Sequence, residues 1–185
     1  MPPKVKITKE AIVSAAVDIV RKEGARALNA RTVAAALACS TQPIFSHFAT
    51  MEQLHRAVVQ QGYQLYGQYT QQEIASGRYP AYKSSGMAYI RFAREEKELF
   101  KLLFMHRPSR ETQESDGLYQ QMTDLVQSNT GLSGEEAQLF HLEIWAVVHG
   151  IATMFATGFL DLPWELVSQM LTDTYQGLRK QYEME

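Results

Sequence analysis

The sequence predicts an all-α protein, and three observations support this fold class. Apolar residues recur at the three- and four-residue spacing of amphipathic helices through most of the chain. No alternation of apolar and polar residues runs longer than three or four positions, as a strand would require. Capping residues, glycines and prolines separate the periodic segments. We expect about nine helices, with a three-helix domain over residues 1–50 and a helical bundle over residues 51–185.

The first predicted helix follows Thr8, a candidate N-cap, and stops at Gly24. Its apolar residues recur on one face: Ile12, Ala15, Ala16, Ile19 and Val20. A second, shorter helix follows the cap Asn29 and buries Val33, Ala34 and Leu37.

A three-residue break separates the second helix from a third. Residues 38–40 (Ala-Cys-Ser) form the break, and Thr41 to His47 form a short helix that turns Ile44 and Phe48 inward. Two short helices joined by a turn of three or four residues are the helix-turn-helix signature of DNA-binding proteins. The segment is therefore predicted to bind double-stranded DNA.

The segment from about Ile7 to Val59 resembles the DNA-binding domain of the TetR (tetracycline-repressor-like) family of bacterial transcriptional regulators. The marks of the resemblance are Glu23-Gly24 before Leu28, Arg31 near the start of the second helix, and an aromatic-x-His-Phe sequence ending at Phe48. The resemblance implies a regulator that binds an operator. It covers about a third of the chain.

Three residues depart from the family pattern. Ala38 stands where the family usually has glycine, so the turn either keeps φ negative or tolerates a mild strain. Phe45 replaces a tyrosine and Met51 replaces a lysine, and both replacements remove an expected phosphate contact. A helical adaptor or ligand-binding protein with weakened or lost DNA binding is therefore the alternative function.

Eight residues are candidates for DNA contact. Gln42 can pair with adenine, Ser46 with several base edges, and Pro43 with a thymine methyl. Contacts to phosphates are expected from the others, which fix the register of the protein on the duplex. For Phe45, packing between helices is the alternative. The full set is Arg31, Ser40, Thr41, Gln42, Pro43, Phe45, Ser46 and His47.

The distribution of charge supports a nucleic-acid partner at the N-terminal end. Residues 1–50 hold seven Lys and Arg against three acids, a net charge of +4. Because the whole chain carries −2, the remainder carries −6. This asymmetry places positive potential where phosphates would lie, although ordinary surface charge is the alternative explanation.

Beyond residue 50 the pattern predicts further helices. A long helix begins at the cap Thr50, with Gln53 completing a capping box, and runs to about Ser76. Others are expected from about residue 81, around Leu99–Met105, over about 111–128, and from Ser133, whose capping box would use Glu136. Asn129–Gly131 is predicted as a turn. Residues 161–163 should break the chain, with Pro163 in the first turn of the last helix.

The C-terminal part also resembles a TetR regulatory domain, from a subgroup named for a Trp-x-x-x-His-Gly element. That element is Trp145-Ala146-Val147-Val148-His149-Gly150 in this chain. The resemblance implies a domain that binds a small apolar or amphipathic effector and dimerises. Candidate pocket residues, each of which could instead be plain core, are Tyr89, Phe92, Phe100, Phe104, Met122, Trp145, His149, Met154 and Phe155.

Other classes of function find little support. The histidines His141 and His149 lie eight residues apart and do not share the i, i+4 register of a metal site, so no metal or cofactor is expected. No catalytic triad, phosphate loop or readable carboxylate pair is present, so the protein is predicted not to be an enzyme. The single cysteine, Cys39, and the lack of a secretory signal fit the cytoplasm. Ile144–Leu160 is better read as a buried helix than as a membrane span.

Together these patterns predict a cytoplasmic, homodimeric regulator of transcription. The last two helices of each copy should form the dimer interface, because an isologous contact is the commonest way to bury such surface. The protein is expected to repress a palindromic operator and to be released by its effector.

Overall fold

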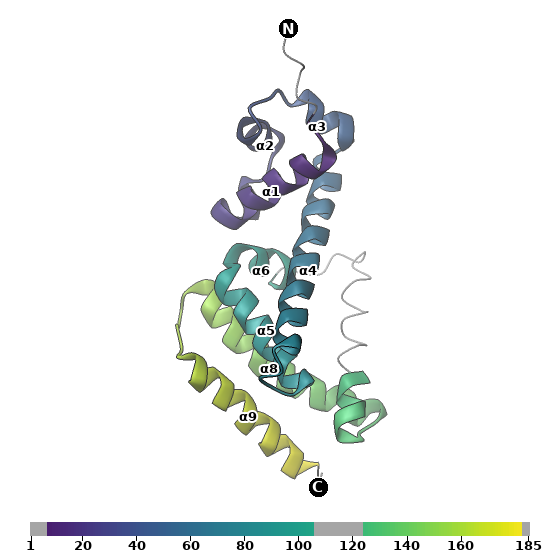
Figure 1. Cartoon of the computed structure of the whole chain (residues 1–185), viewed down its shortest axis with the longest axis vertical. Coiled ribbons are helices and arrows are strands. Elements are labelled where there is room, and N and C mark those ends of the chain that lie inside the picture. Colours follow the sequence, from purple (N-terminus) through teal and green to yellow (C-terminus); the bar gives the residue numbers. More distant parts are fainter. Residues whose placement is uncertain (1–6, 106–123, 183–185) are drawn as a thin grey trace. The chain divides into compact units, whose positions relative to one another are not determined.

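The computed structural model describes residues 7–105 and 124–182. In these ranges every regular element is a helix, which confirms the predicted all-α class (Figure 1). Met122 and most of the helix predicted over 111–128 lie outside the described residues. Residues 124–130 are helical, and the other elements are α1 (Lys9–Glu23), η1 (Ala25–Ala27), α2 (Ala30–Ala36), α3 (Gln42–His47), α4 (Met51–Ala75), α5 (Ala81–Glu95), α6 (Lys97–Phe104), α8 (Gly134–Thr157) and α9 (Trp164–Gln181).

The chain divides into two compact units, and each unit combines two segments that are separated in the sequence. The N-terminal unit combines the chain up to Gly67 with a later segment that begins at Glu96. The C-terminal unit contains Gln68–Glu95 and the described residues from 124 onwards. Helix α4 therefore belongs to both units, and the short connection between α5 and α6 also leads from one to the other. The division predicted at residue 50 separates a DNA-binding part from a regulatory part, and this functional division stays a prediction.

Local capping signals fix the first helices as the sequence predicts. The Thr8 hydroxyl accepts a hydrogen bond from the Ala11 amide at 3.2 Å. Gly24 ends α1 with φ of 84°, a conformation that suits glycine. The Asn29 side chain caps α2 by accepting from the amides of Arg31 and Thr32. These groups satisfy amide donors that a helix leaves unpaired at its first turn.

The turn between α2 and α3 contains a strained residue. Ala38 has φ of 49°, and it is the one non-glycine residue with positive φ in the described chain. Of the two alternatives for this residue, the negative φ is wrong and the strained turn is confirmed. The left-handed conformation costs an L-residue about 1–2 kcal/mol, because its Cβ approaches the following carbonyl oxygen.

Several helix ends differ from the prediction. Ser133 precedes α8 but its side chain makes no capping hydrogen bond, so the capping box with Glu136 is wrong. The chain enters α8 through Gly134 at φ of 56° instead. Residues 124–130 are helical, so the turn predicted at 129–131 begins later, at Gly131.

Two further caps differ in detail. Pro163 is the N-cap of α9 and not a residue of its first turn. At α4, Thr50 caps the Gln53 amide at 3.3 Å. The Gln53 side chain reaches back to the amide of Ala49, one residue earlier than a capping box requires.

The N-terminal unit packs α1 against η1, α2, α3 and α6. Arg21 on α1 binds both carboxylate oxygens of Glu96, and that carboxylate is buried. Helix α6 also lies very close to α4, since a Cβ added at Gly62 would stand 3.2 Å from the Leu103 side chain. The large core side chains of this unit are Ile12, Val20, Val33, Ile44, Phe48, Leu54, Val58, Leu99 and Phe100.

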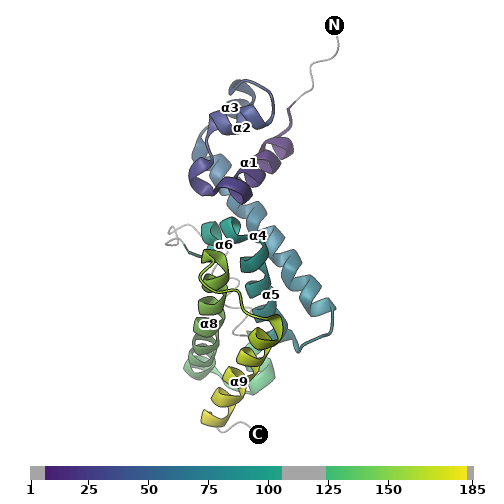
Figure 2. The same cartoon turned by 90° about the vertical axis from the view of Figure 1, so that its left-hand side faces the viewer.

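In the C-terminal unit, α5 contacts both α8 and α9, which also contact each other (Figure 2). Lys83 on α5 fastens α9 by donating to the hydroxyls of Ser168 and Thr172, at 2.8 and 2.7 Å. A separate apolar cluster of this unit surrounds Phe140 on α8. Its other buried members are Val126 and Ala137.

We predict that Ala38→Gly raises the free energy of unfolding by up to about 1 kcal/mol, because glycine adopts positive φ without the steric cost. Ala35→Gly, at an exposed position inside α2, should lower it by about 0.5–1 kcal/mol. Urea denaturation of both variants measures the two effects. Destabilisation by both substitutions would contradict the strain assigned to Ala38.

Candidate DNA-binding and effector sites

The short helix α3 is fixed by its inner face and open on its outer face. Ile44 is fully buried and Phe48 is 3% exposed, so these two side chains anchor the helix in the unit core. Gln42, Ser46 and Phe45 are exposed on the other side, the last to 48%. The arrangement presents a mainly polar surface with one large aromatic ring.

The other predicted DNA contacts lie at or near this surface. Arg31, Ser40 and His47 are exposed, whereas Thr41 and Pro43 are partly buried. His47 has an internal partner, because its Nε2 lies 3.0 Å from the carbonyl oxygen of Ile7. With that nitrogen protonated, the ring donates to the backbone just before α1. The bond ties the end of α3 to the start of the first helix.

The predicted effector residues do not all belong to one unit. Phe100 and Phe104 lie in the N-terminal unit, where Phe104 packs edge-on against Tyr63 and Tyr66. In the C-terminal unit Tyr89, Phe92 and Phe155 are buried, and His149 and Met154 are partly buried. Trp145 is 43% exposed.

Two tyrosine–histidine hydrogen bonds connect α5 to α8. The Tyr82 hydroxyl lies 3.0 Å from Nδ1 of His141, and the Tyr89 hydroxyl lies 2.9 Å from Nδ1 of His149. The Trp145 ring stacks on His149 with centroids 4.8 Å apart. With the imidazoles neutral, each hydroxyl donates and each Nδ1 accepts.

Burial sets the protonation of these pairs. It lowers the pKa of both His141 and His149, because the charged imidazolium loses solvation. It also raises the pKa of Tyr82, with a smaller contribution from Tyr175. Sequence reasoning overlooked Tyr82 and His141 as a pair. The sequence contains a signal for this pair, because Tyr82 and Tyr89 are about two helical turns apart and so are His141 and His149.

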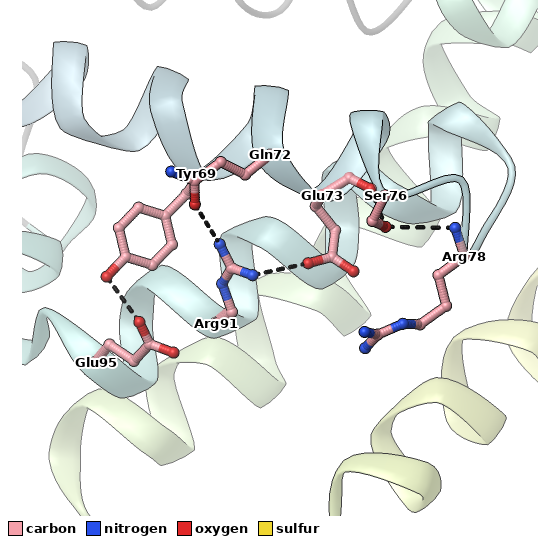
Figure 3. A network of polar contacts seen from close by, with 7 residues as sticks. All are labelled: Tyr69, Gln72, Glu73, Ser76, Arg78, Arg91 and Glu95. Atoms are coloured by element: carbon pink, nitrogen blue, oxygen red, sulfur yellow. Dashed lines mark hydrogen bonds and ion pairs between the residues drawn. The ribbon is translucent and has the colours of Figure 1, made fainter.

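A polar network, shown in Figure 3, fastens the end of α4 to α5. Arg91 donates to Glu73 at 3.0 Å and to Gln72 at 3.2 Å, and its guanidinium lies over the Tyr69 ring. Tyr69 in turn donates to Glu95 at 2.8 Å. Glu73 is 4% exposed, so its carboxylate is almost wholly out of water, whereas Arg91 is partly exposed. Nothing in the periodicity of the sequence marked it.

A small pocket opens beside this network. Its volume is about 190 Å³, and its lining is Arg91, Arg94, Glu95 and Trp164. None of the predicted effector residues is in this lining. The mixed charges of the pocket also differ from the apolar site that the sequence predicted.

Two features of the described residues bear on other functions. They contain no group of three or more His, Cys, Asp and Glu side chains that could hold a metal ion. Helix α8 is long and apolar enough to cross a membrane by length and composition. Core helices of soluble proteins can have the same length and composition, and α8 buries Ile151, Ala152 and Phe155 within its unit.

Comparison with known proteins identifies the class to which this fold belongs. Residues 83–174, about half of the chain, match the family model described as the tetracyclin repressor-like C-terminal domain. Among curated proteins, no sequence matches the chain.

Solved structures share the fold over nearly the whole chain. A TetR-like transcriptional regulator from Rhodococcus sp. RHA1 is 16% identical, with a TM-score of 0.69 over 96% of this chain and 98% of its own. The multidrug binding protein EbrR, complexed with malachite green, is 18% identical, with a TM-score of 0.66 over 93% and 98%. NalD of Pseudomonas aeruginosa, the secondary repressor of the MexAB-OprM multidrug efflux pump, is 14% identical, with a TM-score of 0.55 over 91% and 94%.

The fold is thus that of the helical TetR-like regulators. With the family model matched over its C-terminal half, the chain belongs to the tetracycline-repressor-like (TetR) family.

We predict that the free energy of unfolding falls as the pH is lowered through the range in which His141 and His149 titrate. Their pKa values lie below the unfolded value of 6.5, so protons bind the unfolded chain more readily. The contribution of the two histidines to the free energy of unfolding is therefore fully present above about pH 6.5 and declines below it. Urea denaturation at pH 7 and pH 5 measures the loss.

The control is the double variant His141→Asn, His149→Asn, which keeps an acceptor near each tyrosine but cannot be protonated. It should lose less stability than the natural chain between the two pH values. An equal loss in both proteins would assign the pH dependence to other groups.

Proposed function

We propose that the protein is a transcriptional regulator that binds a palindromic DNA operator. The observation that carries this proposal is α3, which Ile44 and Phe48 fix to the core while Gln42 and Ser46 remain exposed. In helix-turn-helix proteins the second helix of the motif enters the major groove and contacts base edges. We assign base contacts to Gln42, Pro43 and Ser46, and backbone contacts to Arg31, Ser40, Thr41 and His47.

We infer that the active form is a homodimer joined through α8 and α9. Large apolar side chains are exposed at three-residue intervals on α8, at Leu139, Leu142 and Trp145, and on α9 at Leu166. Exposed apolar surface of this kind usually has a partner in the functional assembly. A second copy fits because an isologous contact buries the same surface on both subunits, and two-fold symmetry matches a palindromic site.

A small apolar or amphipathic effector, bound in the C-terminal unit, is the proposed signal. Malachite green in EbrR is a precedent for an aromatic ligand on this fold, and NalD is a precedent for repression. The Tyr89–His149 pair, beside the half-exposed Trp145, would supply polar anchors among apolar neighbours. Phe92, Met154 and Phe155 complete the proposed site within this unit.

Release from DNA would follow from a shift between conformers. An effector that prefers one conformer of the C-terminal unit shifts the population towards it by its difference in affinity, typically about 1–3 kcal/mol. The end of α4 is held in that unit by Glu73 and Arg91, whereas the start of α4 belongs to the unit that carries α3. The α5–α6 connection provides a second route, ending at the Arg21–Glu96 pair.

We predict that the purified chain selects an inverted repeat from random duplex DNA, with an affinity that falls steeply with salt. Gln42→Ala should weaken operator binding about 5–150-fold for each half-site and relax the preference at one base position of the half-site. Arg31→Gln should weaken binding to all sequences alike and reduce the salt slope by about two, one for each subunit. Fluorescence anisotropy over a range of salt concentrations distinguishes these effects.

The same titration tests release. Saturation with a ligand that the protein is shown to bind should lower operator affinity about 5–150-fold. Unchanged affinity would contradict the release mechanism, and failure to bind any duplex at low salt would favour the adaptor instead.

We predict that Leu142→Glu converts the dimer to a monomer, because it places a charge in the centre of the proposed α8 interface. Gln127→Glu, which adds the same charge at an exposed position before α8, should leave the dimer intact. Sedimentation velocity at micromolar concentration measures the difference. A natural chain that sediments as a monomer would refute the interface.

A further inference from the structure

Phe45 is the large apolar side chain on the exposed face of α3. Residues 42, 45 and 46 lie on one side of the helix because they are three and four positions apart. Ile44 and Phe48 occupy the buried side. Because 48% of its surface is exposed, Phe45 is a surface residue and not part of the core. Its position places an aromatic ring among the side chains that would meet DNA.

The neighbouring side chains have other roles. The Ser46 hydroxyl donates to the backbone carbonyl of Gln42 at 2.9 Å, which uses its proton within the helix. His47 is bound to the carbonyl of Ile7. Ser46 can then meet a base edge only as an acceptor, and the longer side chains on this face are the Gln42 amide and the Phe45 ring.

The chemistry of Phe45 restricts its partner on DNA. A phenyl ring has no hydroxyl or amide, so it cannot donate a hydrogen bond to a phosphate oxygen. What it gains on binding is removal of apolar surface from water. The major groove offers one apolar group, the 5-methyl of thymine, whereas the other groups along base edges are hydrogen-bond donors and acceptors.

We propose that Phe45 contacts a thymine methyl in each half-site and so makes a T·A pair part of the operator. This inference rests on the proposed DNA-binding function. It assigns specificity to a side chain that sequence reasoning placed at the phosphates. Gln42, one helical turn earlier, would then read a neighbouring base pair by hydrogen bonds.

The experiment uses the full-length protein and the operator selected from random duplex DNA. Thymines are replaced by deoxyuridine in symmetric pairs, which removes the methyl and leaves every hydrogen-bonding group in place. One pair of replacements should weaken binding about fourfold for each methyl lost, or about sixteenfold for the two half-sites. Replacement at thymines outside the contact should have no effect.

Two variants assign the effect to this residue. Phe45→Ala should bind the unmodified operator more weakly and should no longer distinguish thymine from deoxyuridine at that pair. Phe159→Ala, which removes an exposed phenyl ring in the C-terminal unit, should bind the operator as the natural chain does and keep the full discrimination. Thermal unfolding of both variants checks that α3 remains folded.

The outcomes separate this inference from the function on which it rests. A chain that selects no DNA sequence overturns both. A chain that binds its operator but tolerates deoxyuridine at every position overturns the methyl contact alone. Discrimination that persists in Phe45→Ala also overturns the methyl contact alone, since another side chain then contacts the methyl.

Discussion

The ion pair between Arg21 and Glu96 is the constraint on which the N-terminal unit depends. Two nitrogens of Arg21 donate hydrogen bonds to the two carboxylate oxygens of Glu96. The Glu96 side chain is nearly buried. Removing Arg21 would leave the buried Glu96 carboxylate without its counter-ion, which is unfavourable because that carboxylate has little access to water. The pair therefore holds α6 against α1 across 75 residues of sequence. A segment that follows α5 thus becomes part of the unit that contains α2 and α3.

A corresponding interaction secures the other unit. Glu73 and Arg91 join the last turns of α4 to α5, with Tyr69 packed against both Arg91 and Phe92. Each unit thus contains a pair between a buried carboxylate and a more exposed guanidinium, and the pair holds a helix that leads to the other unit. A buried carboxylate that loses its partner is left without compensation, which favours the paired geometry.

The sequence was sufficient for features that depend on neighbouring residues. The caps at Thr8 and Asn29, the stop at Gly24 and the inward turn of Ile44 follow from short-range chemistry, and the structure has all four. The failures have a different origin. The capping box predicted at Ser133 is wrong because Gly134, the first residue of α8, has a positive φ, which a pattern of residue types does not encode.

Side-chain partners were harder to predict than helices. Helical spacing shows that Phe100 and Phe104 face inward, but not which unit they face, and both lie outside the unit that holds Tyr89 and His149. The Glu73–Arg91 pair joins two helices, so neither helix alone reveals it. For the proposed DNA-binding face, the sequence predicts the exposed positions Gln42 and Ser46, whereas the left-handed Ala38 and the His47–Ile7 bond required coordinates.

The close approach of α4 to α6 at Gly62 gives a final consequence. A Cβ at Gly62 would stand 3.2 Å from the methyl carbons of Leu103, a few tenths of an ångström closer than such atoms ordinarily pack. A methyl group at position 62 would therefore have to displace the end of the Leu103 side chain. Whether that side chain can shift decides whether the two helices can keep their present separation.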